Sequence, residues 1–133
     1  MLGYHLRRAQ VAAFQSFAET VNEPDITPGR LGVLAIVAAN PGLSQTELAN
    51  ALGIDRSTMV AVIDRLENRG LVVRRPAPAD RRSYALHLTP VGTSFLAEIH
   101  ARAMRHERDI ARRLSPEERA QLIALLRRIA ERG

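Results

Sequence analysis

Three residue types are missing from this 133-residue chain, which contains no cysteine, no tryptophan and no lysine. Without cysteine, the chain cannot form disulfide bonds, thiolate zinc sites or thiol-based redox sensors. Its longest apolar run, residues 31–39, is well short of the roughly 20 residues that cross a bilayer. Arg7-Arg8 resembles a twin-arginine export signal, but polar residues interrupt the apolar stretch that should follow. We therefore expect a cytoplasmic protein with no membrane association.

Aromatic residues are scarce, at 4%, whereas 46% of the residues are hydrophobic, which is typical of a single, mainly helical domain with an aliphatic core. The formal net charge is +5 and the isoelectric point is about 11.1. An excess of positive charge favours a polyanionic partner, and nucleic acid fits best. We attribute the exclusive use of arginine to coding bias rather than to function.

Residues 44–68 have the pattern of a helix-turn-helix. Ser44 and Glu47 form a capping box that begins the first helix. Gly53 permits the left-handed conformation that ends this helix, and Asp55 caps the next one. The inward residues of the first helix are expected to be Leu48, Ala49 and Leu52.

The second helix of the pattern has an apolar and a polar side, since a rotation of about 100° per residue separates two groups. The apolar group is Met59, Val62, Ile63 and Leu66, and the opposite group is Ser57, Ala61, Asp64 and Asn68. The polar side, flanked by Thr58 and Arg65, suits a major groove of about 12 Å. We predict base contacts from Ser57, Thr58 and Arg65 and a phosphate contact from Arg56. Alone, the pattern would also suit an ordinary solvated helix.

Residues 71–89 predict a basic β-hairpin, or wing. Residues 71–75 have strand character, Pro76 and Pro78 are expected to break the strand, and residues 79–82 form the tip. The return strand alternates Tyr84, Leu86 and Leu88 against Ser83, Ala85 and His87. Four arginines, Arg74, Arg75, Arg81 and Arg82, would repel one another unless a polyanion binds them. The alternative is a hairpin whose charge serves solubility alone.

The pattern extends beyond the helix pair and the hairpin. Ile26-Thr27-Pro28 precedes it, and Asp80-Arg81-Arg82 leads to Leu88-Thr89-Pro90-x-Gly92. Over nearly its whole length the chain resembles the MarR family of transcription regulators. The resemblance implies a mainly α fold with a small β-hairpin, a winged helix-turn-helix with N- and C-terminal dimerisation helices. We expect residues 1–133 to form a single MarR-type domain, with dimerisation helices in 1–22 and 90–133 and a DNA-binding lobe in 27–89.

The same resemblance implies roles for single residues. Arg82, beside Arg81, would enter the minor groove, and Asp80 would pair with Arg82 to hold it there. Asp64 is likewise expected to position an arginine. A small-molecule effector, an aromatic or lipophilic acid, is implied as well. Pocket residues are expected among His5, Phe14, Phe17, Leu31, Tyr84 and His106, although residues of this kind also serve as ordinary core.

The flanking segments predict amphipathic helices. One covers residues 2–21, Thr27-Pro28 begins another that ends at residue 39, and Thr89-Pro90 and Ser115-Pro116 begin two more. The last should turn Leu122, Leu125, Leu126 and Ile129 inward. The apolar stripes exceed what a small winged helix covers, which favours a homodimer over an intramolecular bundle. The expected interface residues are Leu6, Phe14, Phe17, Phe95, Ile99, Leu122 and Leu126.

Catalytic and metal chemistry are not indicated. The sequence has no Gly-x-Ser-x-Gly elbow and no glycine-rich phosphate loop. His100 and His106 lie about 240° apart around one helix, so they cannot easily share a metal. We expect no enzymatic activity, no cofactor and no metal site.

The favoured function is a sequence-specific regulator of transcription that binds double-stranded DNA. It would be a repressor, released from a pseudo-palindromic operator by a ligand. A nonspecific or architectural DNA-binding protein is the alternative. A regulator should prefer its operator over random DNA by at least ~10³-fold, which distinguishes the two.

Overall fold

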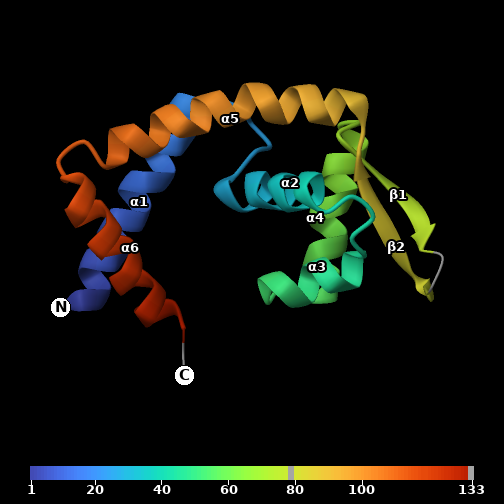
Figure 1. Ribbon diagram of the computed structural model, residues 1–133, viewed down its shortest axis with the longest axis horizontal. Coiled ribbons are helices and arrows are strands. Elements are labelled where there is room, and N and C mark those ends of the chain that lie inside the picture. Colours follow the sequence, from blue (N-terminus) through green and yellow to red (C-terminus); the bar gives the residue numbers. More distant parts are fainter. Residues whose placement is uncertain (78–79, 132–133) are drawn as a thin grey trace. The chain divides into compact units, whose positions relative to one another are not determined.

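The computed structural model describes residues 1–77 and 80–131, although it leaves the side chains of residues 80–82 undescribed. The described part contains six helices and one antiparallel hairpin (Figure 1). The helices are α1 (Leu2–Val21), α2 (Pro28–Ala39), α3 (Gln45–Leu52), α4 (Arg56–Asn68), α5 (Pro90–Ile110) and α6 (Pro116–Ala130), and the strands are β1 (Val72–Ala77) and β2 (Asp80–Leu88). The expected mainly helical class is confirmed. None of the described helices has the length and hydrophobicity that a membrane span requires.

The chain divides into two compact units. Met1–Asn22 and Arg102–Gly133 form one, here called the helical unit, and Glu23–Ala101 form the other, the central unit. The helix-turn-helix and the hairpin both lie in the central unit. Residues 90–101 of α5 belong to the central unit, and the rest of that helix belongs to the helical unit.

Short-range hydrogen bonds set the helix boundaries where the sequence predicts them. The Thr27 hydroxyl accepts a hydrogen bond from the Arg30 amide, and Pro28 occupies the first turn of α2. Capping boxes begin α3 and α6, the latter with Ser115 and Glu118. Asn22 ends α1 in the left-handed conformation. These expected boundaries are confirmed, since caps join residues that are close in sequence.

An aliphatic core holds the central unit together. Its fully buried side chains include Leu34, Leu48, Met59, Ile63, Leu66 and Leu86. Removing such side chains from water is the main stabilising contribution, about 1.5–3 kcal/mol for each large one. Leu52 is an exception: it stands at the end of α3, where the chain turns at Gly53, and it is 38% exposed. Its predicted inward position was wrong.

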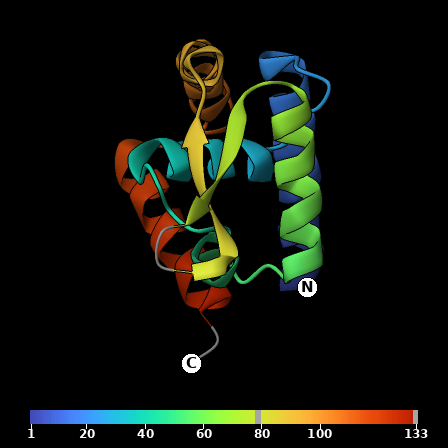
Figure 2. The same ribbon diagram turned by 90° about the vertical axis from the view of Figure 1, so that its right-hand side faces the viewer.

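The strands pair beside α4 (Figure 2), but β1 does not end where the sequence predicts. It continues through Pro76, which lies opposite Tyr84, to Ala77, and the register becomes irregular between Pro76 and Ala77. The predicted break at Pro76 was wrong. A two-stranded ribbon has positions whose N–H points away from the partner strand, and proline loses no hydrogen bond there.

Burial along β2 also differs from the simple alternation. Ser83 and Ala85 are buried, each with 6% exposure, whereas Tyr84 is 49% exposed. The segment 42–44 lies along the other edge of β2, where it exchanges two backbone hydrogen bonds of 2.9 Å with Leu86 and bridges to Ala85. Tyr84 is thus exposed although it alternates with Leu86 on one strand face, and Ser83 and Ala85 are buried where residues 42–44 and α3 lie against β2.

In the helical unit, a buried polar contact joins α1 to α5. The His106 side chain is only 6% exposed, and its Nδ1 lies 3.1 Å from the Ser16 hydroxyl. Its ring meets the Phe17 ring edge to face, with the centroids 5.3 Å apart. The Arg102 guanidinium donates to the carbonyl of Val21 at 2.9 Å.

Helix α6 has no buried residue. The side chains predicted to face inward are 40–46% exposed, namely Leu122, Leu125, Leu126 and Ile129. The predicted inward position of these side chains was wrong for a single copy of the chain. They line one side of a groove, and α1 lines the other side without filling it.

The end of α4, the base of the hairpin and the start of α5 meet around Thr89. Its hydroxyl donates to the carbonyl of Gly70 at 2.5 Å and accepts from the amide of Gly92 at 2.9 Å. Its own amide donates to the carbonyl of Leu71 at 3.0 Å. A Cβ on Gly92 would collide with the carbonyl oxygen of Leu71, so only glycine fits this approach.

We predict that Gly92→Ala lowers the free energy of unfolding by about 3 kcal/mol, because the added methyl group must displace backbone. Urea unfolding measures the effect. Gly32→Ala is the matched control, since nothing lies within 4 Å of a Cβ at that helical position. The control should stabilise the protein by about 0.5–1 kcal/mol. Similar unfolding midpoints for the two variants would contradict the close approach at Gly92.

Candidate nucleic-acid interface

The exposed face of α4 carries the residues expected to touch DNA. Met59, Ile63 and Leu66 are buried, and the exposed residues are Arg56, Ser57, Thr58, Val60, Ala61, Asp64, Arg65 and Asn68. The periodicity therefore predicted correctly which side of the helix faces solvent. This face is small and polar around Ser57 and Ala61, so another surface can approach the helix closely.

Asp55 organises the start of α4. Its carboxylate accepts hydrogen bonds from the Thr58 amide at 2.8 Å, the Ser57 hydroxyl at 2.8 Å and the Thr58 hydroxyl at 3.0 Å. The Thr58 amide, followed by the Ser57 hydroxyl, lowers the pKa of Asp55 below its ordinary value of 3.8.

These hydrogen bonds limit what the two hydroxyls can do. A hydroxyl has one hydrogen to donate and two lone pairs, and Ser57 and Thr58 both give the hydrogen to Asp55. The lone pairs remain able to accept. In the major groove the partners for an acceptor are the amino groups of cytosine and adenine.

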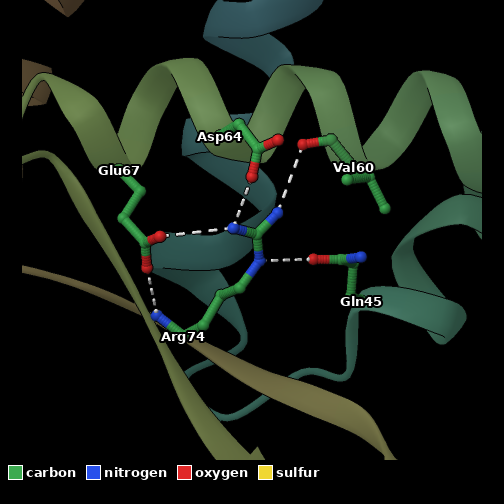
Figure 3. Close-up of polar contacts among 5 residues, drawn as sticks. All are labelled: Gln45, Val60, Asp64, Glu67 and Arg74. Carbon is green, nitrogen blue, oxygen red and sulfur yellow. Dashed lines mark hydrogen bonds and ion pairs between the residues drawn. The ribbon is translucent and has the colours of Figure 1, made fainter.

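A cluster of hydrogen-bond acceptors, two of them carboxylates, surrounds Arg74 of β1 (Figure 3). The guanidinium Nη1 contacts Asp64 at 2.7 Å and Glu67 at 3.2 Å. Nε donates to the Gln45 side chain at 2.9 Å, and Nη2 donates to the carbonyl of Val60 at 3.2 Å. The expected arginine partner of Asp64 is thus Arg74.

From the sequence alone, Arg74 is only one of the four arginines expected on the hairpin. A signal was present, because Arg74 follows Val72 by two residues and so shares its strand face, which is directed towards the core. Asp64 and Glu67 stand one turn apart on α4, which is the spacing of two groups on one helix face. The missing information was which part of β1 lies against α4.

Arg56 and Tyr84 line the same depression of about 340 Å³ in the central unit. Its other lining residues are Gln45, Thr46, Ala49, Met59, Val60 and Ser83. The Tyr84 ring also lies 6.0 Å from the Arg74 guanidinium carbon. The side chains of the predicted wing residues Asp80, Arg81 and Arg82 lie outside the description, although their backbone begins β2.

The other predicted residues are distributed over both units. Phe17 and His106 contact one another in the helical unit, His5 lines the groove between α1 and α6, and Leu31 lies in α2. Phe14 is 53% exposed, whereas Phe17 and Ile99 retain only 5% and 0% of their surface. Phe17 and Ile99, both predicted as interface residues, are already buried within one chain. Leu6 and Phe95 are half-buried.

Comparison with known proteins identifies this arrangement. Residues 25–83 match the sequence profile of the MarR family. A candidate transcriptional regulatory protein for the hcr operon of Thauera aromatica is 50% identical over 129 residues, which cover 96% of this chain and 78% of that protein. The chain belongs to the MarR family.

Solved structures of the transcriptional repressor CouR share the fold closely. CouR bound to a 23-mer DNA duplex matches with a TM-score of 0.91 and 44% identity, over 98% of this chain and 93% of that one. CouR bound to p-coumaroyl-CoA matches with a TM-score of 0.88 and 41% identity, over 100% of this chain and 94% of that one.

Membership of the MarR family makes this protein a DNA-binding transcription regulator with a winged helix-turn-helix, and not an enzyme. Helix α4 takes the place of the recognition helix, and the β1–β2 hairpin is the wing. Among the described residues, no group of three or more histidine, aspartate or glutamate side chains is arranged to hold a metal ion.

We predict that Asp55 contributes to the acid sensitivity of the MarR-family protein. Because the folded-state pKa of Asp55 is depressed, its ionised form stabilises the fold above pH 3.8, and this contribution is lost as the pH falls through the folded-state pKa. Asp55→Asn keeps a cap acceptor but does not titrate. The wild-type advantage in urea midpoint should therefore shrink as the pH is lowered below 3.8.

Asp25→Asn is the control for this measurement, since Asp25 is exposed and its side chain caps no helix. Its urea midpoint should follow that of the wild type across the same pH range. Parallel pH profiles for the wild type and Asp55→Asn would show that the cap at α4 has no charge-dependent contribution.

Proposed function

We propose that this protein is a homodimeric, ligand-responsive repressor that binds a pseudo-palindromic operator. The observation that carries the proposal is the exposed, Asp55-capped face of α4 in a chain similar over nearly its whole length to a repressor bound to a DNA duplex. A twofold dimer would present two copies of α4 to successive major grooves about 34 Å apart.

Within this proposal, Ser57, Thr58 and Arg65 contact bases, and Arg56 contacts phosphate at the start of the helix. The two hydroxyls act as acceptors, because Asp55 takes their hydrogens. The wing presents Arg81 and Arg82 to the minor groove, where a narrow A·T-rich segment concentrates negative potential. Asp80 holds Arg82 in position. Because the protein acts on DNA, we place it in the cytoplasm.

The helical unit supports the homodimer. A groove of about 710 Å³ runs between α1 and α6 and is lined mainly by aliphatic side chains. They are Leu2, Leu6, Ala9, Leu122, Leu125, Leu126 and Ile129, joined by His5 and Arg128. Phe14, on α1, is exposed as well. An apolar surface of this extent favours a protein partner over water, and a second copy of the same unit has the matching character.

We predict a dimer in sedimentation equilibrium at micromolar concentration. Leu126→Arg should weaken it roughly 100-fold or more, since association would bury an unpaired charge. Ala124→Arg adds the same charge to an exposed position about 200° around α6 from Leu122 and should leave the dimer intact. A wild-type monomer with folded helices would refute the homodimer.

The effector we propose is an aromatic acid or its thioester. Support comes from the structure of CouR bound to p-coumaroyl-CoA. CouR is similar to this chain over the full length of this chain. Phe17 and His106 form an aromatic wall in the helical unit, and Phe14 of the same unit offers further apolar surface. Ligand pockets commonly combine such walls with a few polar groups, and His106 with Ser16 provides these.

Selection from random DNA duplexes tests the regulatory function. We expect enrichment of a pseudo-palindrome bound at least ~10³-fold more tightly than random sequence, and p-coumaroyl-CoA should lower that affinity about 5–150-fold. Arg65→Ala should cost about 1–3 kcal/mol on the selected duplex, with a smaller loss on random DNA. Equal losses on both would assign Arg65 to the phosphate backbone. Binding without sequence preference would favour an architectural protein instead.

A further inference from the structure

The cluster around Arg74 has a function that the DNA contacts do not include (Figure 3). We propose that Arg74 is a positioning residue that sets the orientation of the wing against the recognition helix and does not itself bind DNA. The inference rests on the proposed operator binding. It divides the arginines of the wing into one that aligns the hairpin and others that remain available to DNA.

The hydrogen-bonding capacity of Arg74 is almost fully used within the protein. A guanidinium has five N–H groups. Four of them donate in the described structure: one to Gln45, one to Asp64, one to Glu67 and one to the carbonyl of Val60. The side chain is only 14% exposed. A phosphate would have to displace carboxylates to reach it.

The charges of the cluster lead to the same assignment. One guanidinium faces two carboxylates, Asp64 and Glu67, which leaves a formal excess of one negative charge. Such a group repels a polyanion, so attraction of DNA does not explain its presence. Arg74 does screen the repulsion between two acids that stand one turn apart on α4, and so it allows both to remain on that helix.

The geometry explains why the residue is an arginine. Its planar fork reaches the first residue of α3 through Gln45 and the middle of α4 through Val60. The other oxygen of Glu67 accepts from the Arg74 backbone amide at 3.2 Å, so β1 itself is attached to α4. A lysine ammonium is a single point charge and cannot satisfy these directions together. The contacts thereby define an angle between the wing and the recognition helix.

Arg75 provides a matched control. It is the next residue of β1, it carries the same charge, and it is exposed. Successive strand residues point to opposite faces. Arg74→Ala and Arg75→Ala therefore remove the same charge from almost the same place, and any difference between them reports the contacts of Arg74. Arg74→Lys adds a variant that keeps the charge and removes the fork.

Amide hydrogen exchange without DNA tests the positioning directly. In Arg74→Ala, exchange in residues 72–77 should rise about 10-fold or more relative to α2, because β1 loses its attachment to α4. Arg75→Ala should leave this ratio unchanged. Unchanged exchange in Arg74→Ala would overturn the positioning role whatever the protein does with DNA.

DNA binding separates alignment from phosphate contact. On random duplexes, Arg74→Ala should reduce the affinity and the salt slope no more than Arg75→Ala does. On the selected operator, Arg74→Ala should lose about 10-fold more affinity than that, because a misaligned wing cannot enter the minor groove. Arg74→Lys should retain the random-DNA affinity and still lose operator preference.

Two results would overturn the proposal. The first is a salt slope that falls by about two more per dimer in Arg74→Ala than in Arg75→Ala, as expected for lost phosphate contacts. The second is full operator binding by Arg74→Lys, since lysine replaces arginine at a phosphate but not in this cluster. A wild-type protein that selects no duplex would instead refute the proposed function, while the exchange result would still decide the role of Arg74.

Discussion

The carbonyl group of Leu71 is the point on which the central unit depends. It accepts a hydrogen bond from the amide of Thr89 at 3.0 Å, and it occupies the position that a side chain on Gly92 would need. The amide of Leu71 donates to the carbonyl of Leu66 in the last turn of α4. Recognition helix, wing and α5 therefore share one backbone junction. Helix α5 begins at this junction and continues into the helical unit from Arg102.

Acidic residues give the DNA-facing surface its shape. In a protein of net charge +5, carboxylates beside a DNA-binding helix oppose binding at long range. Asp55 nevertheless holds the start of α4 and takes the hydrogens of two hydroxyls, and Asp64 and Glu67 hold Arg74. Each carboxylate directs donors that would otherwise be free to rotate. The surface thus combines an excess of positive charge with a few polar groups that carboxylates hold in place, and groups held in this way can carry specificity.

Much of the fold follows from short-range patterns in the sequence. The caps at Thr27, Ser44, Asp55 and Ser115 each involve an acceptor and an amide three residues apart, so no tertiary knowledge is needed to place them. The buried and exposed sides of α4 follow from helical periodicity in the same way. The error over burial along β2 concerns contacts between distant segments. Ser83 and Ala85 are buried because residues 42–44 and α3 lie against β2, and alternation within one strand carries no information about that segment.

The sequence by itself determined the helices, their boundaries, the helix-turn-helix and the class of partner, because caps, periodicity and net charge are properties of neighbouring residues or of the whole composition. Only the tertiary structure decided which arginine of the wing is engaged by the protein. Arg74 and Arg75 are chemically identical neighbours, and they differ only in which strand face meets Asp64 and Glu67. That difference depends on how β1 lies against α4, and the position of one element against another is set by packing across the core.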